Sequence, residues 1–213
     1  MPSKEDREYR NFKLSILKRA GDDTDEEKVV EGYASTFDEP YELFRWDGYI
    51  YNEVVDRGAF DETDMSDVIM QYDHQGRVFA RTKNNTLDVG PDEKGLFITA
   101  NLGGTDLGTQ VYDEIRGGYT DKMSFGFTVS DDYEEREQTD EGVVIYTRHI
   151  KKVGKLYDVS AVSIPANDAT SISVRKLNDG VIERLKAERL AEEKTELERL
   201  RTETRARLLG GNK

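Results

Sequence analysis

Hydrophobic and polar positions alternate with a period of two residues over many short stretches of this chain. Between residues 122 and 127 the order is Lys-Met-Ser-Phe-Gly-Phe, so the methionine and both phenylalanines share one face of an extended chain, while Ser124 and Gly126 share the other. The first face is typical of a core, and the second offers a hydroxyl with open space beside it. Similar strand patterns occur at residues 12–16, 28–36, 49–55, 68–72, 86–89, 96–101, 123–130, 143–152 and 155–164.

Two segments have helical periodicity instead. Residues 105–117 begin with Thr105 as a cap, carry apolar residues at a spacing of four, and end at Gly-Gly. Residues 181–209 lack Pro and Gly and are dense in Glu, Arg, Lys and Leu, which predicts one long helix without a robust coiled-coil repeat. The polar residues 131–142 predict a solvated loop between two strands.

Many short strands and few helices predict an α+β, β-rich fold. The expected architecture is a closed or strongly curved antiparallel β-barrel with flanking helices, plus a C-terminal helix. Composition changes after residue 178, which predicts a core of residues 1–178 and a charged amphipathic helical tail of residues 179–213. A tail of this kind suits docking on a partner.

Composition narrows the class of protein. The chain has 213 residues, enough for one compact domain with an appendage, and its net charge of −13 disfavours nucleic-acid binding, which requires clustered Lys and Arg. No cysteine is present, which excludes disulfides, thiolate catalysis and cysteine-ligated zinc. The polar N-terminus and the lack of a run of about 18 apolar residues predict a soluble, unsecreted chain without a membrane segment.

Ser124 is the candidate nucleophile. A serine hydroxyl needs an imidazole as its base, and the imidazole needs a third group that fixes its tautomer. His74 follows an apolar run and precedes a polar turn, where a base can face a cleft, and Asp158 lies in an apolar strand where its carboxylate needs a partner such as a histidine N–H. Each residue also has a structural alternative: Ser124 as a small residue in a half-buried strand, and Asp158 as a strand-edge residue facing solvent.

Other chemistries fit the residues less well. A hydrolytic zinc site needs about three ligands, and the two histidines, His74 and His149, are far apart in the sequence, so we expect no metal and no cofactor. An aspartic protease is disfavoured because Asp88 lacks a following hydroxyl residue and its motif has no second copy. A G-x-S-x-G motif is also missing, which argues against the common esterase arrangement.

Five segments, in this order, resemble motifs of the tailed-bacteriophage prohead proteases, the serine proteases that mature phage capsids. Residues 31–37 (E-G-Y-A-S-T-F) resemble the opening strand of that family, and residues 53–60 (E-V-V-D-R-G-A-F) resemble its next segment. His74 falls where the family has its catalytic histidine. The remaining similarities are R-T-K-N-N-T-L at residues 81–87, the nucleophile strand at residues 123–127, and L-Y-D-V-S-A-V-S-I-P-A-N at residues 156–167.

The resemblance implies a triad of Ser124, His74 and Asp158. The chain departs from the family in two places: its acidic residue, Asp73, precedes the histidine instead of following it, and the third member is Asp where Glu is common. The family is similar in fold to the herpesvirus capsid maturation proteases, whose triad is Ser-His-His, so His149 is an alternative third member. The strand pattern around Asp158 matches better and favours that residue.

The resemblance also implies a function. The chain is expected to be a capsid maturation serine endopeptidase that cleaves the scaffold protein or an extension of the major capsid protein, and itself, inside the assembling procapsid in the host cytoplasm. Self-association is a further expectation, whereas nucleic acid and membrane are not expected partners. Ala166 and Asn167 are candidates for backbone oxyanion donors, because Pro165 has no N–H. The alternatives are a catalytically inactive assembly or scaffolding protein on the same fold, and a general host hydrolase.

Overall fold

The structure, a computed structural model, describes residues 7–13, 28–162 and 172–210. The chain divides into two compact units, Met1–Val174 and Arg175–Lys213. The elements are β1 (Glu8–Lys13), β2 (Val29–Thr36), β3 (Tyr41–Trp46), β4 (Tyr49–Val55), β5 (Ile69–Tyr72), β6 (Gln75–Arg81), the 3-10 helix η2 (Thr82–Asn84), β7 (Leu87–Pro91), β8 (Gly95–Asn101), α1 (Asp106–Gly117), β9 (Lys122–Gln138), β10 (Val144–Val162) and α2 (Ile172–Gly210).

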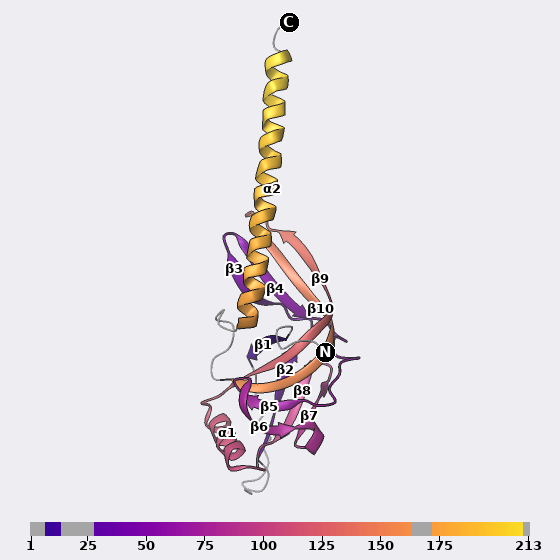
Figure 1. Cartoon of the computed structure of the whole chain (residues 1–213), viewed down its shortest axis with the longest axis vertical. Helices are drawn as coiled ribbons and strands as arrows, with labels where there is room; N and C mark the ends of the chain where they lie inside the picture. The colour runs from indigo at the N-terminus through magenta and orange to yellow at the C-terminus, as the bar shows by residue number, and fades with distance from the viewer. Residues whose placement is uncertain (1–6, 14–27, 163–171, 211–213) are drawn as a thin grey trace. The chain divides into compact units, whose positions relative to one another are not determined.

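Two open sheets form the larger unit (Figure 1). The larger sheet runs in the order β1-β9-β10-β4-β3, with β5 and β6 joined to it through β10, and the smaller sheet has the order β2-β8-β7. The long strand β10 organises the larger sheet, because it pairs with β9 along its length, with β4 at its beginning and with β5 at its end. Both of these shorter partners run parallel to β10, while β9 runs antiparallel.

The predicted closed or strongly curved antiparallel barrel is wrong. Neither sheet is closed or strongly curled: β1 and β3 end the main path of one sheet, and β2 and β7 end the other. The parallel pairs between β10 and its two shorter partners are also foreign to an antiparallel barrel. Alternation along a strand fixes which side chains are buried, but it does not determine which strands pair, so the local pattern could not exclude an open sheet.

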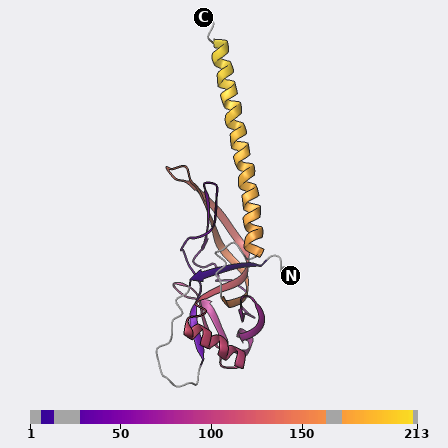
Figure 2. The ribbon, with the colours of Figure 1, turned by 90° about the vertical axis from the view of Figure 1, so that its left-hand side faces the viewer.

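The hairpin of β9 and β10 extends well beyond the core. Residues 131–142, predicted as a loop, are mostly strand, because β9 continues to Gln138 and pairs with β10 up to Val144. The described parts of the two strands predicted at residues 143–152 and 155–164 belong to one strand, β10, whose register shifts between Ile150 and Asp158, and residues 163 and 164 lie outside the described residues. Figure 2 shows the end of this arm beside the end of the β3–β4 hairpin. Side chains on the β9 half of the arm are exposed on both faces, so no alternation marked it as a strand.

Several local predictions are confirmed. The helix α1 begins after Thr105, whose Oγ1 accepts a hydrogen bond from the Gly108 N–H at 3.0 Å, and it ends at Gly118, whose φ is 75°. The strand predicted at residues 49–55 coincides with β4. Strands β3 and β6 were not predicted, because aromatic, charged and glycine residues interrupt their alternation.

The hydrophobic core lies on one face of β9. Met123, Phe125 and Phe127 are buried as their alternation predicted, and the two phenylalanine rings stack with centroids 4.4 Å apart. Phe60 packs edge-on against Phe125 with centroids 6.1 Å apart. Burial of this face fixes the orientation of β9 and therefore directs Ser124 to the opposite side.

The second unit is helical. The predicted helix over residues 181–209 lies within α2, where ion pairs at a spacing of four residues join Arg189 to Glu193 and Arg199 to Glu203. Leu190, Leu197 and Leu200 are exposed on this helix. Across the described residues, no helix is both long and apolar enough to cross a membrane. The domain boundary after residue 178 stays a prediction.

Candidate active site

His74 lies in a two-residue turn between β5 and β6. Tyr72 pairs with Gln75 across the turn, and the intervening Asp73 and His74 have φ values of 49° and 57°. Two consecutive positive φ values are the signature of a type I′ hairpin turn, a conformation that aspartate and histidine adopt more readily than most residues. The Asp73 N–H donates to the Ala161 carbonyl at 3.0 Å and ties the turn to β10. Asp73 is therefore the first of the two turn residues, and His74 is the second.

The structure brings together the three residues predicted from the sequence. His74 Nε2 lies 2.5 Å from Ser124 Oγ, and His74 Nδ1 lies 2.5 Å from Asp158 Oδ1. The imidazole thus bridges the serine on β9 and the aspartate on β10, whose Cα atoms are positioned by sheet pairing. Asp158 pairs with Ile69 of β5, four residues before Asp73, which brings its carboxylate toward the histidine.

Gly126 makes room for the carboxylate. It lies opposite Asp158 in the β9–β10 register, and a Cβ atom added there would overlap the Asp158 carboxylate and lie 2.6 Å from Tyr9 Cε1. The sequence suggested that this glycine leaves open space beside Ser124. That interpretation is wrong, because the aspartate and the tyrosine ring fill the space.

A second serine supports the carboxylate. Ser160 Oγ donates to Asp158 Oδ1 at 3.0 Å, and both side chains are buried. Sequence reasoning missed this residue, although its spacing of two from Asp158 on a strand places both on one face. A buried carboxylate with two hydrogen-bond partners is a stable anchor for the imidazole.

Strand β1 covers the site. It pairs antiparallel with β9, placing Asn11 opposite Ser124 and Tyr9 opposite Gly126. The Tyr9 ring packs edge-on against His74 with centroids 4.4 Å apart, and burial together with the nearby Asp158 carboxylate raises the pKa of the Tyr9 phenol. Ser124 has no exposed surface. Nothing in the local sequence indicated this contact, because the paired residues are more than 100 positions apart.

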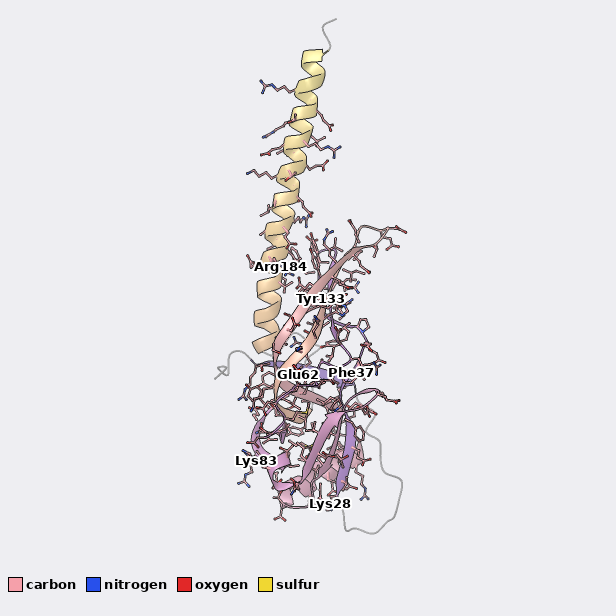
Figure 3. The ribbon with its side chains drawn as sticks, turned by 90° about the vertical axis from the view of Figure 1, so that its right-hand side faces the viewer. Lys28, Phe37, Glu62, Lys83, Tyr133 and Arg184 are labelled. Atoms are coloured by element: carbon pink, nitrogen blue, oxygen red, sulfur yellow. The ribbon has the colours of Figure 1, made fainter. Side chains whose placement is uncertain are left out.

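His149, the alternative third member, belongs to a different cluster. Its Nδ1 lies 2.8 Å from Asp56 Oδ1, and its ring stacks on Tyr133 with centroids 4.6 Å apart. Tyr133 is labelled on the β9–β10 arm in Figure 3. The two candidate oxyanion residues, Ala166 and Asn167, lie outside the described residues. No group of three metal-ligating side chains occurs within the described part of the chain.

The order hydroxyl, imidazole, carboxylate is the arrangement with which serine hydrolases activate a nucleophile. In comparisons with known protein families, residues 15–181 match the caudovirus prohead serine proteases. The match covers most of the chain and all three residues of the cluster, and the chain belongs to this family. Membership places the chain among the bacteriophage serine proteases of capsid maturation. No curated protein and no solved structure matches the chain.

Proposed function

We propose that this chain is the capsid maturation endopeptidase of its phage and that Ser124, His74 and Asp158 are its catalytic residues. The observation that carries the proposal is the unbroken contact from Ser124 Oγ through both ring nitrogens of His74 to Asp158, with both links at 2.5 Å. Family membership adds the reaction class, hydrolysis of peptide bonds by a serine nucleophile.

Each residue has one role in this mechanism. Ser124 Oγ attacks the scissile carbonyl while His74 Nε2 accepts its proton, and the same nitrogen then protonates the leaving amine. Water then hydrolyses the acyl-enzyme: His74 Nε2 accepts a proton from the attacking water and returns it to Ser124 Oγ, which leaves as the hydroxyl. Asp158 holds Nδ1–H and stabilises the imidazolium, and we assign oxyanion stabilisation to the backbone N–H groups of Ala166 and Asn167.

The proposed substrates are the scaffold protein or an extension of the major capsid protein, and the protease chain itself. Cleavage takes place inside the assembling procapsid. The helical tail is proposed as the segment that recruits the protease to this assembly, because Leu190, Leu197 and Leu200 leave apolar surface exposed on an otherwise charged helix.

Co-expression with the phage coat and scaffold proteins tests the proposal. The wild type is expected to trim a partner, and Ser124→Ala is expected to leave every partner at full length. Ser35→Ala is a matched control, since Ser35 is also a fully buried strand serine but lies on β2, where its Oγ donates to the Thr36 carbonyl at 3.3 Å. Trimming by Ser124→Ala would show that another residue is the nucleophile.

The role of the tail has its own test. Replacing Leu190, Leu197 and Leu200 by serine together is expected to leave hydrolysis of a short peptide unchanged and to reduce incorporation of the protease into procapsids. Unchanged incorporation contradicts the recruiting role and leaves the triad assignment intact.

One observation favours the second candidate, an inactive assembly protein on the same fold: Ser124 has no exposed surface, and β1 pairs with the strand that carries it. A nucleophile that no substrate reaches has no catalytic use. A fluorophosphonate probe, which reacts with activated serines, discriminates between the candidates, because an inactive protein stays unlabelled even when β1 is loosened.

A further inference from the structure

Strand β1 occupies an edge that would otherwise be open. In the larger sheet, residues 122–127 of β9 pair with β10 on one side and with β1 on the other. The family match begins at residue 15, so β1 lies outside the part of the chain that the family defines. An exposed strand edge beside a nucleophile is a surface on which an extended peptide binds by adding a strand.

The backbone of Arg10 reaches the nucleophile. Its carbonyl oxygen accepts a hydrogen bond from Ser124 Oγ at 2.9 Å. In a bound substrate, the carbonyl nearest the serine belongs to the residue that precedes the cleaved bond. The hydroxyl has one proton, so donation to this carbonyl competes with donation to His74 Nε2. The contact is therefore substrate-like in position.

The side chain of Arg10 fills a buried acidic site. Its Nη2 donates to Glu53 Oε2 at 2.8 Å, its Nε donates to the other oxygen of the same carboxylate, and Glu53 has no exposed surface. Burial alone would lower the pKa of the Arg10 guanidinium, but the carboxylates of Glu53 and Glu8 raise it above its ordinary value. The bidentate pair matches a guanidinium better than an ammonium.

The charges around Glu53 leave a place for a cation. With β1 present, the guanidinium groups of Arg10 and Arg148 face the carboxylates of Glu8, Glu53 and Asp132. Without β1, both Arg10 and Glu8 are absent, and Arg148 alone faces two carboxylates. The excess of one carboxylate is the same with and without β1, but Glu53, which has no exposed surface, loses its bidentate guanidinium, and this favours an arginine side chain over a neutral or acidic one.

We infer that the β9 edge and the Glu53 site together bind the substrate, with arginine preferred over neutral residues just before the cleaved bond, and that β1 closes this groove as a substrate-like strand. The inference rests on the proposed serine mechanism. Glu53 is then a specificity residue, and Arg10 is the anchor that keeps β1 in the groove. Cleavage of another chain requires β1 to leave.

The rate at which a fluorophosphonate labels Ser124 in the full chain tests the closure. Arg10→Ala is expected to be labelled at least tenfold faster than the wild type. Arg45→Ala is the control, since it removes an exposed guanidinium that pairs with Glu42 on β3, and it should match the wild type. Equal rates for Arg10→Ala and the wild type, with both labelled, overturn the inference while the serine mechanism stands. No labelling in any variant overturns the serine mechanism itself.

Two further measurements test the inference where Arg10→Ala folds poorly. Glu53→Gln, which keeps the shape of the site but removes its charge, is expected to speed labelling in the same way. A peptide with the sequence of residues 7–13 is expected to slow the labelling of Arg10→Ala and to have less effect on Glu53→Gln, whereas the same peptide with alanine in place of Arg10 slows neither. Equal inhibition by both peptides overturns the role of the arginine.

Specificity is read from peptide hydrolysis. For the Arg10→Ala protein, peptides with arginine before the cleaved bond are expected to have kcat/KM at least tenfold above those with glutamine. Adding Glu53→Gln is expected to remove this preference by lowering only the value for the arginine peptide. A preference that survives in the double variant overturns the assignment of Glu53.

Discussion

The two histidines of this chain have similar immediate surroundings, yet only one of them faces a serine hydroxyl. Both bind an aspartate through Nδ1, and their side chains have similar exposed fractions, 18% for His74 and 19% for His149. The difference lies at Nε2, which meets Ser124 Oγ at 2.5 Å in one case and Glu135 Oε2 at 3.7 Å in the other. A histidine–carboxylate pair thus becomes a candidate base only where a nucleophile faces the free nitrogen.

Substituting the two histidines gives the largest expected contrast. His74→Ala is expected to lower kcat/KM by up to about 10⁶-fold, since His74 Nε2 is the base that contacts Ser124 Oγ among the described residues. His149→Ala is expected to stay within about twofold of the parent, because its contacts to Asp56 and Tyr133 only fix the β9–β10 arm. Hydrolysis of an arginine peptide by the Arg10→Ala protein measures both. A comparable loss in both variants would remove the distinction between the two sites.

The aspartates give the next contrast. Asp158→Asn is expected to lower kcat by about 10⁴-fold, because an amide that donates to Nδ1 stabilises the tautomer with its proton on Nε2 and leaves no base facing Ser124. Asp56→Asn is expected to have little effect, since its histidine faces no nucleophile. The pH dependence of kcat separates a changed tautomer from a misfolded protein. Full activity of Asp158→Asn would show that another group orients the His74 imidazole.

Substitution of Gly126 tests how closely the cluster of Ser124, His74 and Asp158 is packed. Gly126→Ala is expected to displace the Asp158 carboxylate or the Tyr9 ring and to lower kcat by about 10²-fold, the usual result of a misplacement near 1 Å. Gly90→Ala is the control, because Gly90 also lies in a strand and a Cβ there would meet nothing within 4 Å. Equal activity of the two variants would mean that the site tolerates displacement of its carboxylate.

The regions around His74 and His149 also differ in how much of their structure the sequence predicts. Alternation places Ser124 opposite a buried face, and the apolar context of Asp158 predicts a polar partner, so the catalytic candidates follow from local pattern and chemistry. The polar arm that carries Tyr133 has no such alternation and was predicted as a loop. Its strand structure comes from pairing with β10, a contact that the local sequence does not encode.

Long-range pairing accounts for the remaining differences. The barrel prediction failed because the parallel partners of β10 come from distant parts of the chain. The strand β1 illustrates the same limit, since Arg10 is 43 positions from Glu53 and 114 positions from Ser124. The Arg10 guanidinium is buried by ion pairs that only the folded chain assembles.

Acid is expected to loosen β1, the strand that packs against the site of His74. Burial raises the pKa of Glu8, but Arg10 and then Arg148 lower it more, so its pKa lies below the ordinary 4.5. A carboxyl with a lowered pKa stabilises the docked β1 above pH 4.5, and this stabilisation is lost as the pH falls through the lowered value. The loss of one charge-assisted interaction corresponds to about a tenfold increase in the opening of β1.

Hydrogen exchange of the amides at residues 8–13, corrected for the intrinsic effect of pH, measures this opening. Protection in β1 should fall between pH 6 and pH 3. In Glu8→Gln the protection of β1 should be lower at neutral pH and should change less on acidification, because the titrating group is gone. If both proteins lose protection equally, the Glu8 contacts with Arg10 and Arg148 do not hold β1 beside Ser124, and its docking depends on the Arg10–Glu53 pair and the strand hydrogen bonds.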